Sequence, residues 1–281
     1  MNSRRGGLAP FFILTFALTW GLQVPGVLAL RGVLPGNSNA YLPLAGLGIF
    51  GPLAAAIILT GREGGKTAVK ALIAPLLRWR VETGWYLAVL IPAVLVTVLL
   101  FLLNLAGRHG PIAYVPSAGG ILFGVVASVS EEIGWRGFAL PRLQQRWGGF
   151  AASGFLGAVW YLWHLPMFMG QDIRLNLVLV MLLFFTGGSL LLTWVYNGTG
   201  GSLLLCSLGH LAVHLNNSHR ALPSEVVPVL GHAIIFAALG LLAMRGALLR
   251  GGERGGKVRK PSLLNSGLQT DAELAALAPR S

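Results

Sequence analysis

Six polar residues that could do chemistry lie inside apolar stretches of this sequence. They are Glu131, Glu132 and Arg136 in one stretch, His164 in a second, and His210 and His214 in a third. If these stretches cross a membrane, each buried charge costs about 2.5–3.5 kcal/mol on insertion scales, so such residues are functional candidates. Carboxylates beside imidazoles are typical of hydrolysis by an activated water.

Two routes to that hydrolysis are open to these side chains. In the first, a glutamate and a histidine deprotonate water, and further donors stabilise the oxyanion formed when the water attacks an amide. In the second, a carboxylate and imidazole nitrogens hold a divalent metal such as zinc, with one position left for water. The candidate metal ligands are Glu131, His164, His210 and His214. Both routes fit the residue types, so the sequence is compatible with a metal-free mechanism and with one that uses a divalent metal ion.

The spacing of the charged residues predicts different tasks for the two glutamates. In a helix, Glu132 and Arg136 lie one turn apart and can meet on one face, whereas Glu131 points about 100° away. We expect Arg136 to neutralise and orient Glu132, which leaves Glu131 free to accept a proton. Small residues, Gly124 among them, precede Glu132 at four-residue intervals and predict the close approach of a neighbouring helix.

Each of these residues also has a structural interpretation. A histidine in a membrane helix can simply bond a neighbouring helix, and a glutamate–arginine pair or a tryptophan can serve packing. Those interpretations do not predict the coincidence of two carboxylates, an arginine and three histidines in three helices at compatible depths. Other nucleophiles are less favoured, since no His-Glu-x-x-His or Gly-x-Ser-Gly motif occurs and the single cysteine, Cys206, lies in an apolar run.

The elements that must position these residues are predicted to be membrane helices. Of the 281 residues, 54% are hydrophobic and 11% are charged, against about 25% charged in soluble domains. Apolar runs fall at residues 8–30, 41–61, 84–106, 117–139, 149–168, 174–196, 200–217 and 226–245. This pattern excludes an ordinary soluble globule and predicts an all-α fold, a polytopic transmembrane helical bundle of about eight spans.

The basic residues predict how these spans are oriented. With the N-terminus in the cytoplasm, seventeen Lys and Arg residues fall on the inner side, and four fall outside: Arg31, Arg108, Arg174 and Arg220. We therefore expect a multi-pass cell-membrane protein with both termini cytoplasmic. The basic segment from Arg62 to Val81 is predicted either to lie along the inner interface or to form a simple loop.

The chain is predicted to have one membrane-embedded domain and a tail. The domain covers residues 1–249, with its motif core at 117–217, and residues 250–281 form a basic, disordered cytoplasmic tail. The net charge of +12 fits contact with a lipid bilayer better than contact with nucleic acid, which is not expected as a partner.

Three motifs that follow one another in order resemble those of a known family. They are Glu-Glu-x-x-x-Arg at Glu131 to Arg136, aromatic-x-x-x-His at Trp160 to His164, and a final histidine motif at His210. With them the chain resembles the CPBP family of intramembrane proteases, also called Abi. That family includes the type II CAAX prenyl endopeptidase and bacterial proteins linked to bacteriocin self-immunity. The resemblance covers about residues 130–214.

The resemblance implies a protease-like role for each matched residue. It makes Glu131 the principal catalytic base, with His164 helping to activate water, in an intramembrane endopeptidase of the CAAX-protease type. His210 would stabilise the oxyanion, or bind metal in the metalloprotease interpretation of the family. Glu132 and Arg136 would support the site. The implied substrates are peptides or membrane proteins, prenylated in one activity of the family.

Two positions depart from the family pattern. Trp160 stands where the family often has phenylalanine, and His214 stands where the last motif commonly has asparagine. Imidazole can replace an amide as a hydrogen-bond donor, but it can also bind metal. The change at His214 leaves open an alternative function, a catalytically idle membrane scaffold or bacteriocin-immunity protein. A transporter with a proton relay is less favoured, because no inverted repeat is visible.

Overall fold

The computed structural model describes residues 7–35, 37–107, 117–169, 175–217 and 226–252. Over these ranges the chain consists of helices joined by turns, and it contains no strand. The predicted all-α class is therefore confirmed.

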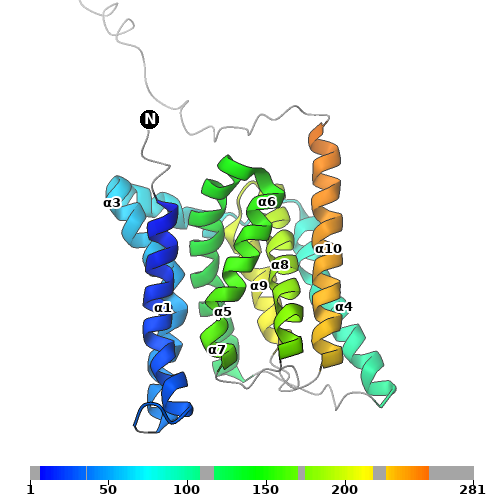
Figure 1. Cartoon of the computed structure of the whole chain (residues 1–281). Helices are drawn as coiled ribbons and strands as arrows, with labels where there is room; N and C mark the ends of the chain where they lie inside the picture. Colours follow the sequence, from blue (N-terminus) through cyan, green and yellow to red (C-terminus); the bar gives the residue numbers. More distant parts are fainter. Residues whose placement is uncertain (1–6, 36, 108–116, 170–174, 218–225, 253–281) are drawn as a thin grey trace, which may run out of the picture. The chain divides into compact units, whose positions relative to one another are not determined.

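Eight main helices correspond one to one to the predicted apolar runs (Figure 1). They are α1 (Leu8–Leu30), α3 (Gly51–Ile73), α4 (Thr83–Leu105), α5 (Ala118–Glu132), α6 (Leu140–Trp163), α8 (Leu175–Gly198), α9 (Leu203–Asn217) and α10 (Val226–Gly252). Shorter elements connect them: η2 (Ser38–Tyr41), α2 (Leu42–Leu47), η3 (Gly48–Phe50), η4 (Ala74–Leu77), η5 (Ile133–Ala139) and α7 (Leu165–Met169).

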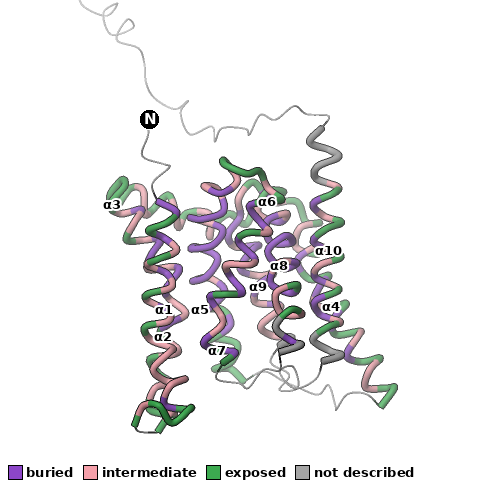
Figure 2. Tube along the Cα trace, in the orientation of Figure 1, coloured by how far each residue is buried: buried purple, intermediate pink, exposed green. Residues whose placement is uncertain are grey.

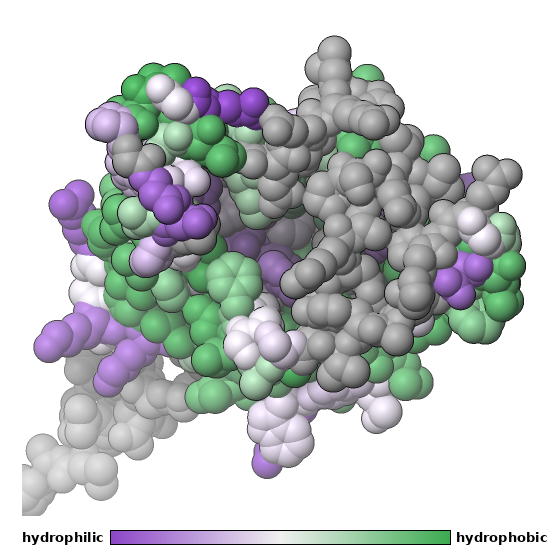
Figure 3. Space-filling model, turned by 90° about the horizontal axis from the view of Figure 1, so that it is seen from below, coloured by the Kyte–Doolittle hydropathy of each residue, from purple (hydrophilic) through white to green (hydrophobic). Residues whose placement is uncertain are grey.

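Several of these helices are long and apolar enough to cross a membrane. Among the described residues, four candidate spans meet both criteria: Leu8–Leu30, Ser38–Leu77, Thr83–Leu105 and Leu179–Gly198. Large apolar side chains also cover much of the outer surface, which Figure 3 shows from below. This protein is therefore a membrane protein with a helical bundle. The count of eight spans and the cytoplasmic termini stay predictions.

Two glycine kinks separate membrane helices from their continuations. In α3 the helical backbone breaks at Gly64 and Gly65, and the helix then resumes through Lys70 as far as Ile73. In α6 it breaks at Gly148, whose φ of +73° is a conformation that glycine adopts readily. The segment predicted as an interfacial helix or a simple loop therefore begins as a helix, and Trp79 near its end is 59% exposed.

The passage from α5 to α6 is an unbroken helix with a wider turn. The π-helical element η5 joins the two helices directly and contains Arg136. Single turns of π-helix are rare and often occur at functional sites, because the extra residue rotates the side chains that follow it. Here it follows immediately after the two glutamates that end α5.

The core lies where α6, α8, α9 and the C-terminal half of α5 pack together, and Figure 2 shows much of this region as buried. Helices α6 and α8 approach closely at Gly157, where an added Cβ would lie 2.6 Å from the Cα of Thr186. The absence of a side chain at Gly157 is therefore what allows this contact.

The chain divides into two compact units, Met1–Arg245 and Gly246–Ser281. All the site residues lie in the first unit. Most of the predicted tail at 250–281 lies outside the described residues, so its disorder and the domain boundary at residue 249 stay predictions.

Candidate active site

The predicted site residues come from neighbouring parts of the first unit. They are Glu131 and Glu132 at the end of α5, Arg136 in η5, His164 directly after α6, and His210 and His214 one turn apart on α9. Hydrogen bonds and ring contacts connect all six, either directly or through Trp160. The structure therefore brings the whole predicted set together.

Gly124 allows α5 and α9 to meet at this site. A Cβ added to Gly124 would lie 3.1 Å from Cδ1 of Leu211 and 3.2 Å from Cβ of His214. A side chain here would therefore press on the side chains of Leu211 and His214. The close helix approach predicted from the small residues of α5 is confirmed at this position.

Glu132 is held by two buried partners. Nη1 of Arg136 donates to Oε1 of Glu132 at 2.9 Å, and Nδ1 of His210 lies 2.9 Å from the same oxygen. A carboxylate can only accept, so the His210 ring carries a proton on Nδ1. In the neutral ring Nε2 then keeps its lone pair. The predicted pairing of Glu132 with Arg136 is present, and it also fixes the orientation of His210.

Glu131 has a different environment from its neighbour. Its side chain is 2% exposed, and its Oε2 accepts a hydrogen bond of 2.6 Å from the indole N–H of Trp160. The guanidinium of Arg136 bonds Glu132 instead and stacks over the Trp160 ring, 4.9 Å from the ring centroid. The two adjacent carboxylates thus have different partners, and their separate roles in catalysis stay a prediction.

Glu131 forms a compact group with the two histidines of α9. One possible ligand atom from each of Glu131, His210 and His214 lies within 4.8 Å of the other two. The two imidazole rings are stacked, with centroids 4.9 Å apart and an angle of 13° between their planes. A carboxylate oxygen and two imidazole nitrogens at this separation are a donor set that could hold a metal ion.

His164 lies beside this group without belonging to it. Its Nδ1 is 2.9 Å from the backbone carbonyl of Trp160, and its half-buried ring packs 4.5 Å from that of Phe185. A carbonyl only accepts, so the proton of the neutral ring is on Nδ1 and Nε2 keeps its lone pair. The candidate ligand set derived from the sequence included His164, whereas the compact group does not.

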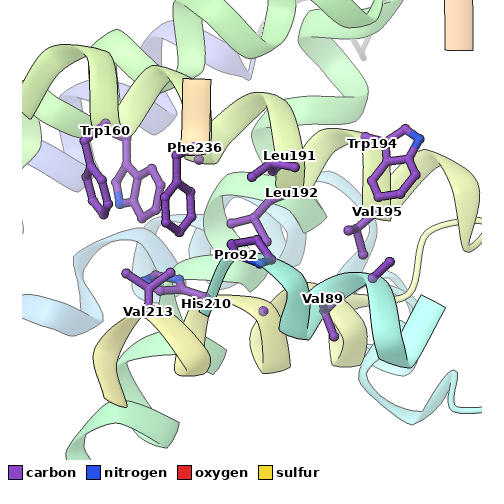
Figure 4. Close-up of a pocket in the computed structure, with 14 residues that line it drawn as sticks. Val89, Pro92, Trp160, Leu191, Leu192, Trp194, Val195, His210, Val213 and Phe236 are labelled. Atoms are coloured by element: carbon purple, nitrogen blue, oxygen red, sulfur yellow. The ribbon is translucent and has the colours of Figure 1, made fainter. Parts of the chain in front are cut away.

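A small apolar pocket adjoins the site (Figure 4). Residues of α4, α6, α8, α9 and α10 line it, and Trp160 and His210 form part of the wall. These two side chains lie at some distance from Trp194 and Val195, which line another part of the pocket in Figure 4. An apolar cavity thus reaches a side chain that contacts the buried carboxylates.

Two contacts were not predicted from the sequence: the hydrogen bond from Trp160 to Glu131 and the packing of Phe185 against His164. The tryptophan was expected to be a packing group, although its place four residues before His164 signals that both lie on one helix face. No pattern in the sequence identifies Phe185, because it approaches His164 only through the packing of α8 against α6.

Parts of this chain are similar to known proteins. Residues 113–216 match the family described as type II CAAX prenyl endopeptidase Rce1-like. A similar protein is "CAAX prenyl protease 2" of Methanococcus maripaludis, 26% identical over 238 residues, which cover 76% of this chain and 85% of the relative. The matched segment begins just before α5, ends on α9 and contains the whole site, so the part of the chain that carries the site is similar to CAAX prenyl proteases.

Proposed function

We propose that this protein is an intramembrane endopeptidase of the CAAX-protease type, which hydrolyses peptide bonds of prenylated, membrane-associated substrates. The observation that carries the proposal is the buried carboxylate of Glu131 within reach of imidazole nitrogens. Its neighbour Glu132 is paired with Arg136. Glu131 is therefore the carboxylate that is available as a base.

Glu131 and His164 activate the attacking water in this proposal. Oε2 of Glu131 is occupied by the Trp160 N–H, so the other carboxylate oxygen takes the proton from water. His164 is bonded through Nδ1, which leaves its Nε2 to accept a hydrogen bond from the same water. Water attacks the scissile carbonyl carbon, and the proton passes to the leaving amine as the peptide bond breaks.

His210 can act in two ways, depending on its protonation. When the ring is protonated, Nε2–H donates to the oxyanion, and Glu132 at Nδ1 stabilises the positive charge. When the ring is neutral, the same nitrogen carries a lone pair and can bind a metal ion. The contact between Glu132 and His210 serves either role.

A divalent metal ion fits the compact group. Carboxylate oxygens and imidazole nitrogens are ligands that Zn²⁺ takes in proteins, and one such atom from each of the three residues lies within 4.8 Å of the other two. A carboxylate on the far nitrogen of a ligating histidine, as Glu132 is for His210, is the usual outer contact of such sites. The residues that would hold such an ion, in place of the direct Glu131–His164 route, are Glu131, His210 and His214. When bound, the ion would acidify a coordinated water and polarise the scissile carbonyl.

The apolar pocket supports a lipid-modified substrate. Its walls are almost entirely hydrophobic, and it adjoins His210 and Trp160. A prenyl group is an apolar chain, and such a wall would contact it without leaving a polar group unpaired. The relative named "CAAX prenyl protease 2" supports the same substrate class.

Cleavage of an internally quenched, farnesylated CAAX peptide by the detergent-purified protein tests the function. Wild type should cleave it, and Glu131→Gln should not. Glu63→Gln is the matched control, because Glu63 is a partly exposed carboxylate that pairs with Arg142 on α6. Equal activity of wild type and Glu131→Gln would overturn the proposal. A cellular phenotype that survives Glu131→Gln and His164→Ala would favour the idle scaffold or immunity protein.

Metal content tests the ligand set separately. Zinc bound per chain is measured by mass spectrometry in wild type, His214→Asn and a control, His232→Asn, which alters a buried histidine of α10. We expect one Zn²⁺ per chain in wild type and in the control, and at least about tenfold weaker binding in His214→Asn. If metal-free protein cleaves the peptide and chelators do not inhibit it, the metal-dependent mechanism is refuted. The mechanism in which Glu131 and His164 activate water directly then stands.

A further inference from the structure

Trp160 makes more contacts with the site than packing alone requires. Its indole N–H donates to Glu131, its ring face carries the guanidinium of Arg136, and its ring lies edge-on to that of His210, with centroids 5.1 Å apart. Its backbone carbonyl accepts from His164. One residue therefore contacts Glu131, His164 and His210, as well as the arginine that supports them.

The hydrogen bond to Glu131 has the features of a specific contact. It is 2.6 Å long, and both side chains are at least 95% buried. A hydrogen bond to a charged acceptor is roughly twice as strong as a neutral one, and burial removes the competing water. The bond leaves the carboxylate with one committed oxygen and one available oxygen, and it restricts rotation of the carboxylate.

A second tryptophan on α6 shows that such bonds are not confined to the site. The indole N–H of Trp163, also buried, donates to Oγ1 of Thr19 on α1 at 2.8 Å, and so joins two helices. Both tryptophans satisfy their N–H groups, but only the N–H of Trp160 bonds the carboxylate. Removing the two hydrogen bonds separately therefore shows which effects come from losing any buried indole hydrogen bond. The remaining effects come from losing the bond between Trp160 and Glu131.

We propose that Trp160 is a positioning residue, whose indole N–H fixes the Glu131 carboxylate in the orientation that receives a proton from water. The proposal rests on the proposed function and goes beyond it. A phenylalanine at this position would keep an aromatic ring and lose the donor. The tryptophan of this chain therefore supplies a donor to Glu131 that an aromatic ring without an N–H would lack.

Kinetics with the farnesylated, internally quenched CAAX peptide test the proposal. We expect Trp160→Phe to lower kcat by about ten- to a hundredfold, the range for losing a hydrogen bond to a charged group. Thr19→Val, which removes the partner of the other buried indole, should lower the melting temperature and leave kcat within about twofold of wild type. A Trp160→Phe variant with wild-type kcat overturns the proposal.

Replacing the indole N–H of Trp160 with another atom separates the effect of the hydrogen bond from the effect of the shape of the ring. Benzothienylalanine, introduced at position 160 by codon suppression, replaces the indole N–H with sulfur and keeps the bicyclic ring against the pocket. We expect kcat to fall as in Trp160→Phe and KM to stay within about twofold, because the apolar wall is unchanged. A purely structural role predicts wild-type kcat for this variant, and that result would refute donation as the cause.

A nuclear magnetic resonance measurement tests the contact without any cleavage. In protein labelled with ¹⁵N-tryptophan, the indole resonance that disappears in Trp160→Phe is that of Trp160. We expect Glu131→Ala to shift this resonance more than any other indole resonance, and Glu63→Ala to leave it unchanged. If Glu131→Ala does not shift the Trp160 resonance, the positioning role of Trp160 is refuted, even if the protein cleaves the peptide. If Glu131→Ala shifts the resonance but the wild-type protein does not cleave the peptide, the proposed protease function is refuted and the contact between Trp160 and Glu131 is supported.

Discussion

Helices α4 and α5 belong to the same bundle, yet α4 buries only apolar side chains whereas α5 buries polar and charged ones. Both expose apolar side chains at their outer faces: Leu87, Val94 and Leu102 on α4, and Ile121, Leu122 and Phe123 on α5. The buried positions of α4 are apolar, whereas α5 and the following turn bury Ser128, Ser130, Glu131, Glu132 and Arg136. Ionisable side chains are thus found where neighbouring helices, rather than lipid, surround them.

The difference shows what makes a buried charge tolerable in this bundle. Glu132 has a guanidinium and an imidazole within 2.9 Å, and Glu131 has an indole N–H. A charge on the outer face of α4 would have no such partners, and the backbone of a helix has no spare donor to offer it. Four substitutions test this comparison.

The largest effect is expected at Glu131. Replacing it with glutamine removes the base and should lower peptide cleavage by about 10²–10⁴-fold. The free energy of unfolding should stay equal or rise, because a buried amide costs less than a buried carboxylate. Cleavage rates and thermal unfolding in the same detergent measure both. A large loss of stability would mean that the carboxylate of α5 is structural.

The next effect is expected from Arg136→Met. It leaves Glu132 buried without its arginine and should lower the free energy of unfolding by about 3–5 kcal/mol. The double variant Arg136→Met/Glu132→Gln should recover most of that loss. Arg142→Met is the control, because its partly exposed pair with Glu63 contributes less than about 1 kcal/mol. Equal losses for both arginines would contradict the distinction between buried and exposed pairs.

A charge on the outer face of α4 tests the other side of the comparison. Val94 lies in the middle of α4 and is 57% exposed. We expect Val94→Arg to make insertion of this helix less favourable by about 2.5–3.5 kcal/mol, with Val94→Leu as the neutral control. A glycosylation assay of inserted chains measures this. Unchanged insertion would mean that this face of α4 does not contact lipid.

The smallest effect is expected at the helix contact that supports the site. A Cβ on Gly157 would lie 2.6 Å from the Cα of Thr186, so Gly157→Ala should destabilise the protein by about 1–3 kcal/mol. Gly154→Ala, three residues earlier on α6, places its Cβ in open space and should be neutral or slightly stabilising. Thermal unfolding compares them, and equal behaviour would argue against close packing of α6 and α8.

Much of the candidate site could be predicted from the sequence, since its residues stand out against an apolar background. The one-turn spacing of Glu132 and Arg136 predicted their contact, and Gly124 marked the approach of α9. Apolar runs located every main helix but not its ends. The runs beginning at residues 41 and 149 are only parts of longer helical segments, because hydropathy does not register the polar turns on the far side of the kinks at Gly64, Gly65 and Gly148.

The sequence by itself determined the helical membrane class and the residues available for chemistry, because hydrophobicity and helical spacing are local properties. The tertiary structure decided which of those residues meet. His210 bonds Glu132 across 78 residues of sequence, and Trp160 bonds Glu131 across 29. Those contacts, like the grouping of Glu131 with His210 and His214 and not with His164, depend on the depth, rotation and separation of packed helices, which no single helix encodes.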